Sequence, residues 1–520
     1  MIQQVSVKLL PAEASASAFI LRAAAAALNV APKAITGYNL LKRSIDARSR
    51  QVYFILTLQV FINEPFHKRA SNEPVYKDLP ARAPKVLIAG AGPAGLFAAL
   101  RLIELGIKPI ILERGKDVRA RRRDLAALNK TGVVHPDSNY CFGEGGAGTY
   151  SDGKLYTRSN KRGDINRILN IFIHFGADEN IGIDAHPHIG TNKLPHIITA
   201  MREQIIASGG EVHFEQRITH INIQDGAITG VKTASGAHFD GEDLILATGH
   251  SARDIFIMLN NQGILLEAKP FALGVRVEHP QELIDSAQYH CAVRGEFLPP
   301  ASYSLVEQVQ GRGVFSFCMC PGGIIAPAST EPGELVVNGW SPSKRNNPYA
   351  NSGMVVSIEA ADFQPFAEHG QLAAMYYQRE VEINAYNAGG GKFVAPAQRM
   401  TDFIKGRVSA TLPNCSYVPG VKSTDLREVL PAVVHTRLAE AFKAFGKKMT
   451  GYYTSEAILV ATESRTSSPV RIPRDNDTLE HPQVKGLYPC GEGAGYAGGI
   501  VSAAMDGERI ANVINAKLSK

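Results

Sequence analysis

The feature that most constrains this fold is a glycine-rich turn between an apolar segment and a helical one. The chain runs through Val-Leu-Ile-Ala into Gly90-Ala91-Gly92-Pro93-Ala94-Gly95, and Glu113 closes the next apolar segment. Strand, turn, helix, strand and acid in this order predict a βαβ unit that binds a dinucleotide. Gly90 permits the tight turn, Gly92 lets backbone approach a pyrophosphate, and Gly95 lets the helix pack closely on the strand. We expect Glu113 to accept hydrogen bonds from ribose hydroxyls.

The length and the punctuation of the chain predict several domains. At 520 residues, the chain is too long for one compact core. The segment from Glu64 to Pro84 contains four prolines among mixed charges, which is typical of a linker. We therefore predict a small α+β domain (1–80), a nucleotide-binding domain (85–268 and 454–520) and an inserted β-rich substrate domain (269–453).

Composition favours a cytoplasmic globular protein. Hydrophobic residues make up 45% and charged residues 20%, and no long apolar run lacks both charges and glycines, so we expect no membrane span. The N-terminus shows no pattern of an export signal. The six cysteines are sparse and irregular, which suits a reducing compartment. Beyond His186-Pro187-His188, the histidines show no ligand spacing, and we expect no metal site.

Two later segments extend the nucleotide-binding pattern. An apolar strand ends in Ala247-Thr248-Gly249, and Tyr-Pro-Cys leads into Gly491-Glu492-Gly493 before a helix that opens with Gly499-Ile500-Val501. The N-terminus of that helix would stabilise negative charge on a bound ring. The strand that leads to Ile218 fits an adenine contact through its backbone, although an ordinary edge strand explains it equally well.

These segments resemble the FAD-binding flavoproteins with two dinucleotide folds, in which an acid followed by Arg binds the FAD ribose and a Gly-Asp element binds the ribityl chain. Here Arg114 follows Glu113, and Glu492 stands where Asp is usual. Arg114 alone would also suit a 2′-phosphate. The resemblance implies a Rossmann-like, glutathione-reductase-type α/β fold with FAD as cofactor.

Nearly the whole chain is similar to a bacterial family of FAD-dependent dehydrogenases, described also as NAD(P)/FAD-dependent oxidoreductases, which has no established substrate. The similarity rests on the runs Phe142 to Leu155, Glu463 to Ile472 and Lys42 to Arg48. From the pattern and the resemblance together, the residues expected to hold FAD are Gly90, Ala91, Gly92, Pro93, Ala94, Gly95, Glu113, Arg114, Gly146, Gly148, Thr149, Ile218, Thr248, Gly249, Gly491, Glu492, Gly499, Ile500 and Val501.

Two segments supply candidates for the reaction itself. Arg465 stands among small hydroxyl residues and could anchor an anionic substrate; a plain salt bridge explains it equally well. In an alternating strand, Ser316, Cys318 and Cys320 would share one face. The Cα atoms of Cys318 and Cys320 would then lie about 6.7 Å apart, so a disulfide between them would need local distortion of the strand. The simpler interpretation is that these small side chains form a pocket wall. Our catalytic candidates are Arg465 and Cys320.

The sequence thus predicts an oxidoreductase that transfers hydride at flavin N5 and acts on a small molecule. This molecule could be anionic, and NAD(P)H could bind transiently. The competing hypothesis is recruitment to RNA or a protein partner through the N-terminal domain. Residues 1–80 carry ten Lys or Arg against five Asp or Glu, out of a net charge of +6 for the chain. Few aromatic side chains accompany these cations, so we do not expect nucleic acid as a partner.

Overall fold

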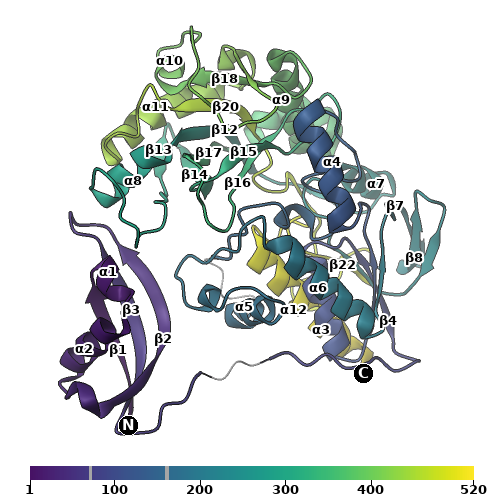
Figure 1. The fold of residues 1–520 in the computed structure, drawn as a ribbon. Helices are drawn as coiled ribbons and strands as arrows, with labels where there is room; N and C mark the ends of the chain where they lie inside the picture. Colours follow the sequence, from purple (N-terminus) through teal and green to yellow (C-terminus); the bar gives the residue numbers. More distant parts are fainter. Residues whose placement is uncertain (70–72, 158–162, 520) are drawn as a thin grey trace.

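The computed structural model describes residues 1–69, 73–157 and 163–519. Its N-terminal part is a three-stranded antiparallel sheet of order β1-β3-β2 that packs against two helices (Figure 1). Alternate residues of β3, among them Leu56 and Leu58, are buried, as the alternating sequence predicts. The elements are β1 (Ile2–Leu9), α1 (Pro11–Ala14), α2 (Ser17–Leu28), η1 (Pro32–Ala34), β2 (Ile35–Asp46) and β3 (Tyr53–Ile62).

The N-terminal part is attached to the rest of the molecule by contacts of Arg43 as well as by the chain. The Arg43 amide donates to the Ile183 carbonyl at 2.9 Å, the Ala185 amide donates to the Arg43 carbonyl at 2.9 Å, and the Arg43 side chain pairs with Asp184 at 2.7 Å. The described parts of 64–84 contain no helix or strand; residues 70–72 of this predicted linker lie outside the described residues.

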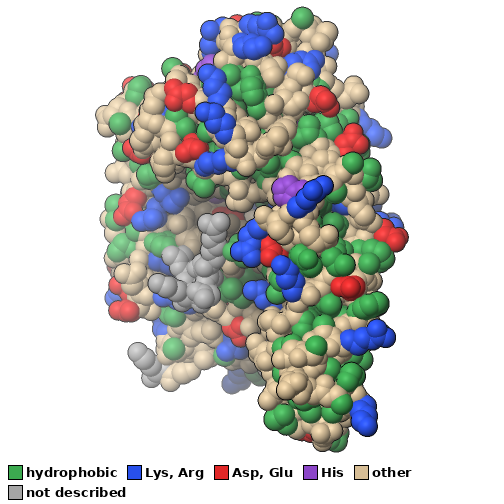
Figure 2. Space-filling model, turned by 90° about the vertical axis from the view of Figure 1, so that its left-hand side faces the viewer, with side chains coloured by type: hydrophobic (Ala, Val, Ile, Leu, Met, Phe, Trp, Pro, Cys, Tyr) green, Lys and Arg blue, Asp and Glu red, His purple; other side chains and the backbone are tan. Residues whose placement is uncertain are grey.

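The basic charges proposed for recruitment are partly neutralised within the protein. Arg43 pairs with Asp184, and Arg48 pairs with Asp46 at 2.8 Å. Figure 2 shows the side of the molecule that carries this part, and its Lys and Arg side chains are spread among Asp, Glu and hydrophobic side chains. This distribution does not favour a binding surface for RNA.

The second part is built on a five-stranded parallel sheet of order β22-β10-β4-β5-β6. Successive residues of β4 face opposite sides. Val86 and Ile88 pack with helices α3, α5, α6 and α12, and Leu87 and Ala89 pack with helix α7 and the small sheet β7-β8-β9. Both faces of the sheet are therefore covered, as the continuous apolar strand predicts.

The elements of this part are β4 (Lys85–Ala89), α3 (Pro93–Glu104), β5 (Lys108–Leu112), α4 (Val118–Thr131), η2 (Gly146–Gly148), α5 (Ile165–His174), η3 (Glu179–Gly182), α6 (Leu194–Ala207), β6 (Glu211–His213), β7 (Ile218–Gln224), β8 (Ala227–Thr233), β9 (His238–Asp240), β10 (Leu244–Leu246), α7 (Arg253–Asn261), β21 (Val470–Arg471), β22 (Leu487–Pro489) and α12 (Ile500–Leu518).

The third part, at the top of Figure 1, is a seven-stranded, largely antiparallel sheet of order β13-β14-β17-β12-β20-β18-β19. Strand β20 lies inside this sheet, between β12 and β18, although it follows the predicted boundary at residue 453. The elements are β11 (Glu267–Ala268), β12 (Phe271–Pro280), α8 (Gln281–Tyr289), β13 (Val306–Val309), β14 (Arg312–Cys320), β15 (Ile324–Pro327), β16 (Val337–Trp340), β17 (Tyr349–Ile358), η4 (Ala360–Leu372), α9 (Ala373–Gly389), β18 (Ala395–Arg399), α10 (Met400–Ile404), β19 (Val421–Ser423), η5 (Leu426–Glu428), α11 (Ala432–Lys448) and β20 (Ile458–Glu463).

Among residues 1–69, 73–157 and 163–519, none of the helices combines the length and the apolar character that crossing a bilayer requires. The same residues contain no group of three or more His, Cys, Asp or Glu side chains placed to hold a metal ion.

Candidate functional site

A cavity of about 380 Å³ lies at the carboxyl ends of the parallel strands, where open α/β sheets bind their ligands. One wall consists of the turns that follow β4, β5, β10 and β22. Phe317 and Cys318 of β14, Asn338 of β16, and Arg465 after β20 form part of the facing wall. The cavity therefore lies between the parallel sheet and the seven-stranded sheet.

The three glycines of the first turn have the separate roles that their spacing predicts. Gly90 has φ +104°, and a Cβ there would lie 2.6 Å from the Ala247 carbonyl oxygen. A Cβ on Gly95 would lie 2.0 Å from the Gly90 oxygen, so only glycine allows the helix this close to the strand. A Cβ on Gly92, the residue before α3, would have Gly146 Cα as its nearest neighbour at 3.8 Å. Gly92 therefore keeps the cavity free beside the N-terminus of α3.

Glu113 organises the backbone around this turn. Its carboxylate is buried and accepts hydrogen bonds from the amides of Ala91 at 2.8 Å, Gly115 at 2.8 Å and Gly143 at 3.0 Å. A carboxylate has about four lone-pair sites, and Oε2 accepts only the Ala91 bond. Glu113 also lines the cavity, so it retains capacity for a ribose hydroxyl. The predicted ligand is at the same time the residue that holds the turn together.

Arg114 is engaged by the protein itself. Its guanidinium pairs with Asp137 and Asp254, each at 2.7 Å, and lies 4.0 Å from the centre of the Phe142 ring. It lines the cavity, but its charge is matched by two carboxylates. The alternative role of Arg114 as a partner for a 2′-phosphate is therefore not favoured by the structure.

Most of the residues predicted to hold FAD line the cavity. These are Gly90, Gly92, Pro93, Ala94, Glu113, Arg114, Gly146, Gly148, Ile218, Thr248, Gly249, Gly491, Glu492, Gly499 and Ile500. Four others, Ala91, Gly95, Thr149 and Val501, are not among the lining residues, because their side chains or Cα atoms face the core. Thr149, for example, is fully buried, and its hydroxyl donates to the Glu144 carbonyl at 2.9 Å. These four support the wall and do not form its surface.

A second helix N-terminus reaches the cavity from the end of the chain. Helix α12 starts at Ile500, directly after Gly499, and both residues line the cavity. Helix α3 starts at Pro93 on the same wall, and the two helices share one hydrophobic core. Two positive helix ends at one cavity favour a ligand with negative charge, such as a pyrophosphate.

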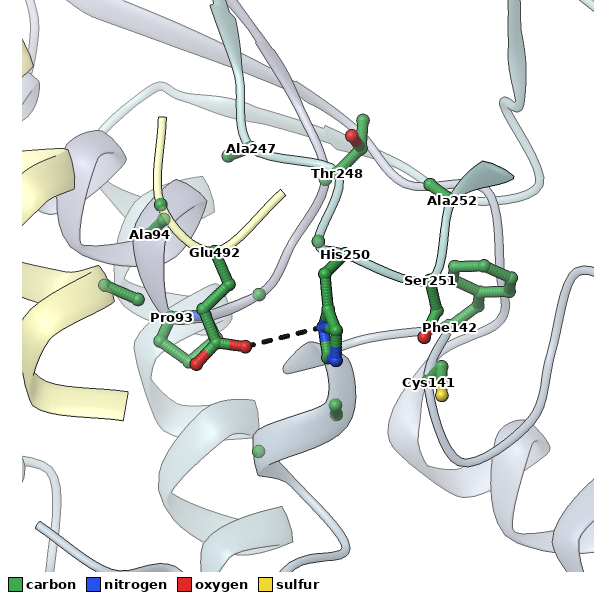
Figure 3. Close-up of a pocket in the computed structure, with 18 of the residues that line it drawn as sticks. Pro93, Ala94, Cys141, Phe142, Ala247, Thr248, His250, Ser251, Ala252 and Glu492 are labelled. Atoms are coloured by element: carbon green, nitrogen blue, oxygen red, sulfur yellow. Dashed lines mark ion pairs between the residues drawn. The ribbon is translucent and has the colours of Figure 1, made fainter. Parts of the chain in front are cut away.

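His250 is a cavity residue that the sequence did not single out. Figure 3 shows its ring pointing toward Glu492, with Nδ1 3.6 Å from the carboxylate. Nε2 lies 2.8 Å from the Arg465 carbonyl, so Nε2 carries the proton and Nδ1 holds a lone pair. Burial and the nearby Arg465 lower the pKa of His250 to about 4. Its position directly after the Thr248-Gly249 turn was the available signal.

Arg465 lines the cavity but is tied into a buried ion-pair network. It contacts Glu382 through two hydrogen bonds of 2.9 and 3.1 Å, lies 3.4 Å from Glu334 and donates to the Thr330 hydroxyl at 2.8 Å. Arg253 pairs with the same Glu382 at 2.9 Å. Of the two roles left open, anion anchor and salt bridge, the structure shows the salt bridge.

The predicted thiol face is altered by the backbone of β14. Cys318 has φ +45°, and the pairing with β17 shifts register between Phe317 and Cys320. The simple alternation therefore fails: Phe317 and Cys318 line the cavity, and the Ser316 hydroxyl accepts from the Leu305 amide at 2.9 Å. Cys320, our catalytic candidate, is fully buried behind Cys318 and is not part of the cavity surface.

Sequence comparisons agree with a flavin nucleotide site. The family model "FAD-dependent protein, C-terminal domain-like" matches residues 270–466, "FAD binding domain" matches residues 83–131, and a domain of unknown function matches residues 1–61. A protein of Clostridium beijerinckii described as "Uncharacterized protein" is 40% identical over 505 residues, which cover 94% of each chain. The chain belongs to the same family of FAD-dependent proteins as this relative, and FAD is its cofactor.

Solved structures share the fold only loosely. The 2,6-dihydroxypyridine-3-hydroxylase from Arthrobacter nicotinovorans is 10% identical with a TM-score of 0.39, and the match covers 84% of both chains. The tetracycline destructase Tet(51) is 11% identical with a TM-score of 0.34, and the match covers 84% of this chain and 82% of that one. Likeness at this level carries no activity over to this chain.

The residues present fit FAD. Gly92 leaves free the space that a side chain would fill, two helix N-termini reach the cavity, and Glu113 lies at the end of β5 with an oxygen available. Gly491 and Glu492 reach the same cavity from the far end of the chain. Together they would hold the nucleotide on the wall formed by the parallel sheet.

Proposed function

We propose that this protein is an FAD-dependent oxidoreductase of the dehydrogenase type, with a small-molecule substrate bound between the flavin and the seven-stranded sheet. Bound FAD supplies two-electron chemistry by hydride transfer at N5. The observation that carries the proposal is that one cavity has a dinucleotide-binding wall on one side and, on the other, a wall that includes the Arg465 guanidinium and the Cys318 thiol. In this proposal, the reactant approaches the ring through that space.

In this proposal, Glu492 holds a proton beside the substrate, and the neutral ring of His250 lies next to it. The pKa of His250 is about 4 because the ring is buried near Arg465, so the ring is neutral at pH 7 and its Nδ1 presents a lone pair toward Glu492. Burial raises the pKa of Glu492, which favours its protonated form. A proton on Glu492 therefore lies within 3.6 Å of an acceptor nitrogen.

The charge of the substrate is a separate proposal. Of the cations at the cavity, Lys154, Arg114 and Arg465 each have a carboxylate partner within 3.4 Å, and Arg217 lies 3.5 Å from Asp137. An anionic substrate would have to share Arg465 with Glu382, so the observations that support an anion are the two helix ends and not a free guanidinium. NAD(P)H would enter the same cavity transiently as electron donor.

The test is anaerobic reduction of the purified, FAD-loaded protein by NADH or NADPH. The loss of flavin absorbance measures the reduction. We expect full bleaching by at least one nicotinamide. His250→Gln should retain FAD and slow the bleaching or the return to oxidised flavin, with Gln288→Asn as control outside the cavity. Flavin that stays oxidised with both nicotinamides, but is bleached by dithionite, would contradict the assignment of NAD(P)H as donor.

A further inference from the structure

We propose that Cys318 and Cys320 form a redox-active dithiol that exchanges two electrons with the FAD in the adjoining cavity. The proposal rests on the proposed function insofar as it requires two-electron flavin chemistry. It adds a second redox centre, within the chain itself, and predicts a thiol or disulfide as the substrate class.

The two thiols are placed around one cation at the edge of the cavity. The Lys154 ammonium lies 3.7 Å from the Cys318 sulfur and 3.7 Å from the Cys320 sulfur. Cys318 lines the cavity together with Glu492 and Gly249, residues of the flavin wall, and Cys320 is fully buried behind it. One thiol thus faces the cofactor and the other is shielded from solvent, the arrangement of an exchanging sulfur and its internal partner.

The backbone of β14 shows the local distortion that a pair two residues apart requires. Cys318 has φ +45°, in the left-handed region that non-glycine residues seldom adopt, and lies in the bulge between Phe317 and Cys320. Such a conformation persists only where the surroundings hold it. Here Arg276 donates to the Cys318 carbonyl at 2.6 Å, and the Cys320 sulfur lies 3.3 Å from the same carbonyl.

Arg276 is fixed for this purpose by the core of the seven-stranded sheet. It is fully buried, pairs with Glu463 at 3.0 Å and donates to Asn351 at 2.9 Å. The same guanidinium lies 3.4 Å from the Cys320 sulfur. Burying a cation such as Arg276 costs desolvation free energy, which its partners must offset. Those partners include the Cys318 carbonyl in the bulge and the Cys320 sulfur. A plain wall of small side chains would require none of these contacts.

The electrostatics give the two sulfurs different roles. A hydrogen bond from Cys320, with Lys154 and Arg276 nearby, holds the pKa of Cys318 well below the ordinary range of a thiol. Burial raises the pKa of Cys320. Cys318 is therefore the thiolate, and Cys320 keeps its proton. The charged and titratable groups around the pair are Lys154, Asp152, Arg345, Arg276, Glu463 and Glu492.

The reaction balances without a further reagent. The Cys318 thiolate and the Cys320 thiol form one S–S bond, and two electrons and the Cys320 proton pass to oxidised flavin, which becomes the singly protonated, anionic reduced form. In the reverse direction, the disulfide would accept two electrons and one proton from reduced flavin and open to the Cys318 thiolate and the Cys320 thiol. The Cys318 thiolate would then reduce a substrate disulfide by thiol–disulfide exchange, which forms the Cys318–Cys320 disulfide again. NAD(P)H would return the oxidised flavin to its reduced form.

The first experiment counts electrons. FAD-loaded wild-type protein, oxidised and freed of small thiols, is titrated anaerobically with dithionite. We expect uptake of twice as many electrons per flavin as in Cys318→Ser or Cys320→Ser, because the disulfide accepts two beyond the two of the flavin. Cys291→Ser, which removes a half-buried cysteine outside the cavity, should match the wild type. Equal uptake by wild-type and Cys318→Ser protein would overturn the proposal.

A second measurement needs no variant. Trypsin should release Gly313–Lys344, a peptide that contains Cys318 and Cys320 and no other cysteine. After denaturation and alkylation, the peptide from oxidised protein should carry no alkyl group and be lighter by two hydrogens than the reduced peptide. The peptide from reduced protein should carry two alkyl groups. Full alkylation of the peptide after oxidation would refute the disulfide even if the variants fail to fold.

The roles of the thiols have their own test. In reduced wild-type protein, iodoacetamide should label Cys318 before Cys320. Lys154→Met should move the labelling of Cys318 to higher pH, and Lys154→Arg should restore most of it, whereas a structural lysine would leave the labelling profile in place. Nicotinamide bleaching of flavin in Cys318→Ser reports on the proposed function separately. If wild-type flavin is not bleached, the dithionite titration still decides the fate of the dithiol.

Discussion

The two walls of the cavity recognise their ligands by different means. The wall on the parallel sheet consists of turns after strands, and it works through backbone amides, helix ends and missing side chains, as at Gly92. The wall on the seven-stranded sheet contains Cys318, backed by buried Arg276, and Arg465, held by buried Glu382. The first wall can hold one kind of ligand, a dinucleotide; the second contains groups whose charge and redox state can change.

The largest effect is expected from the backbone wall. Gly92→Val places a side chain where the pyrophosphate would lie, so FAD loading should be abolished. Flavin absorbance per protein, after saturation with FAD and gel filtration, measures this. Gly295→Val, on an exposed segment with open space around the Cα, is the matched control and should load fully. A yellow Gly92→Val protein would show that the cofactor lies elsewhere.

Glu113→Gln should have the next largest effect, because an amide cannot accept three backbone hydrogen bonds and would turn an N–H toward one of the donors. We expect a loss of about 1–3 kcal/mol in stability and a weaker affinity for FAD, by about tenfold. Fluorescence titration with FAD and thermal unfolding measure the two. Glu203→Gln, at an exposed position, should change neither. An unchanged affinity for FAD would show that Glu113 does not contribute to cofactor binding.

On the charged wall, Arg465→Ala should separate stability from cofactor binding. The substitution leaves Glu382 paired only with Arg253, so we expect the protein to lose about 3 kcal/mol of stability. FAD bound per folded chain should not change. Arg379→Ala, which removes a half-exposed partner of Glu334, should cost less than about 1 kcal/mol. Loss of flavin from folded Arg465→Ala protein would show that the two walls are not independent.

The smallest effect on the cofactor is expected from removing residues 1–80. Their sheet contacts the nucleotide-binding part through Arg43 and the segment Ile183–Ala185, and neither lines the cavity. The truncated protein should therefore bind one FAD per chain with wild-type affinity. A soluble truncated protein without flavin would show that the N-terminal sheet is needed for the cofactor site to form.

The sequence predicted the backbone wall far better than the charged one. The glycines, the apolar strand and Glu113 are close in sequence, and their spacing follows from the geometry of one βαβ unit. His250 follows the predicted Thr248-Gly249 turn, but its contact with Glu492 arises because separate turns converge at the cavity. The strand alternation that placed Ser316 and Cys320 on the cavity surface failed because Cys318 adopts a left-handed conformation, which no local pattern indicates.

The order of strands in the parallel sheet also sets when the cofactor can be acquired. Strand β22 and the start of helix α12 bring Gly491, Glu492 and Gly499 to the cavity, and they are among the last elements of the chain. The ribosome therefore synthesises residues 90–500 before both helix ends of the cavity are present. A chain stopped before Gly491 would keep the turn after β4 and Glu113 but would lack the second helix end.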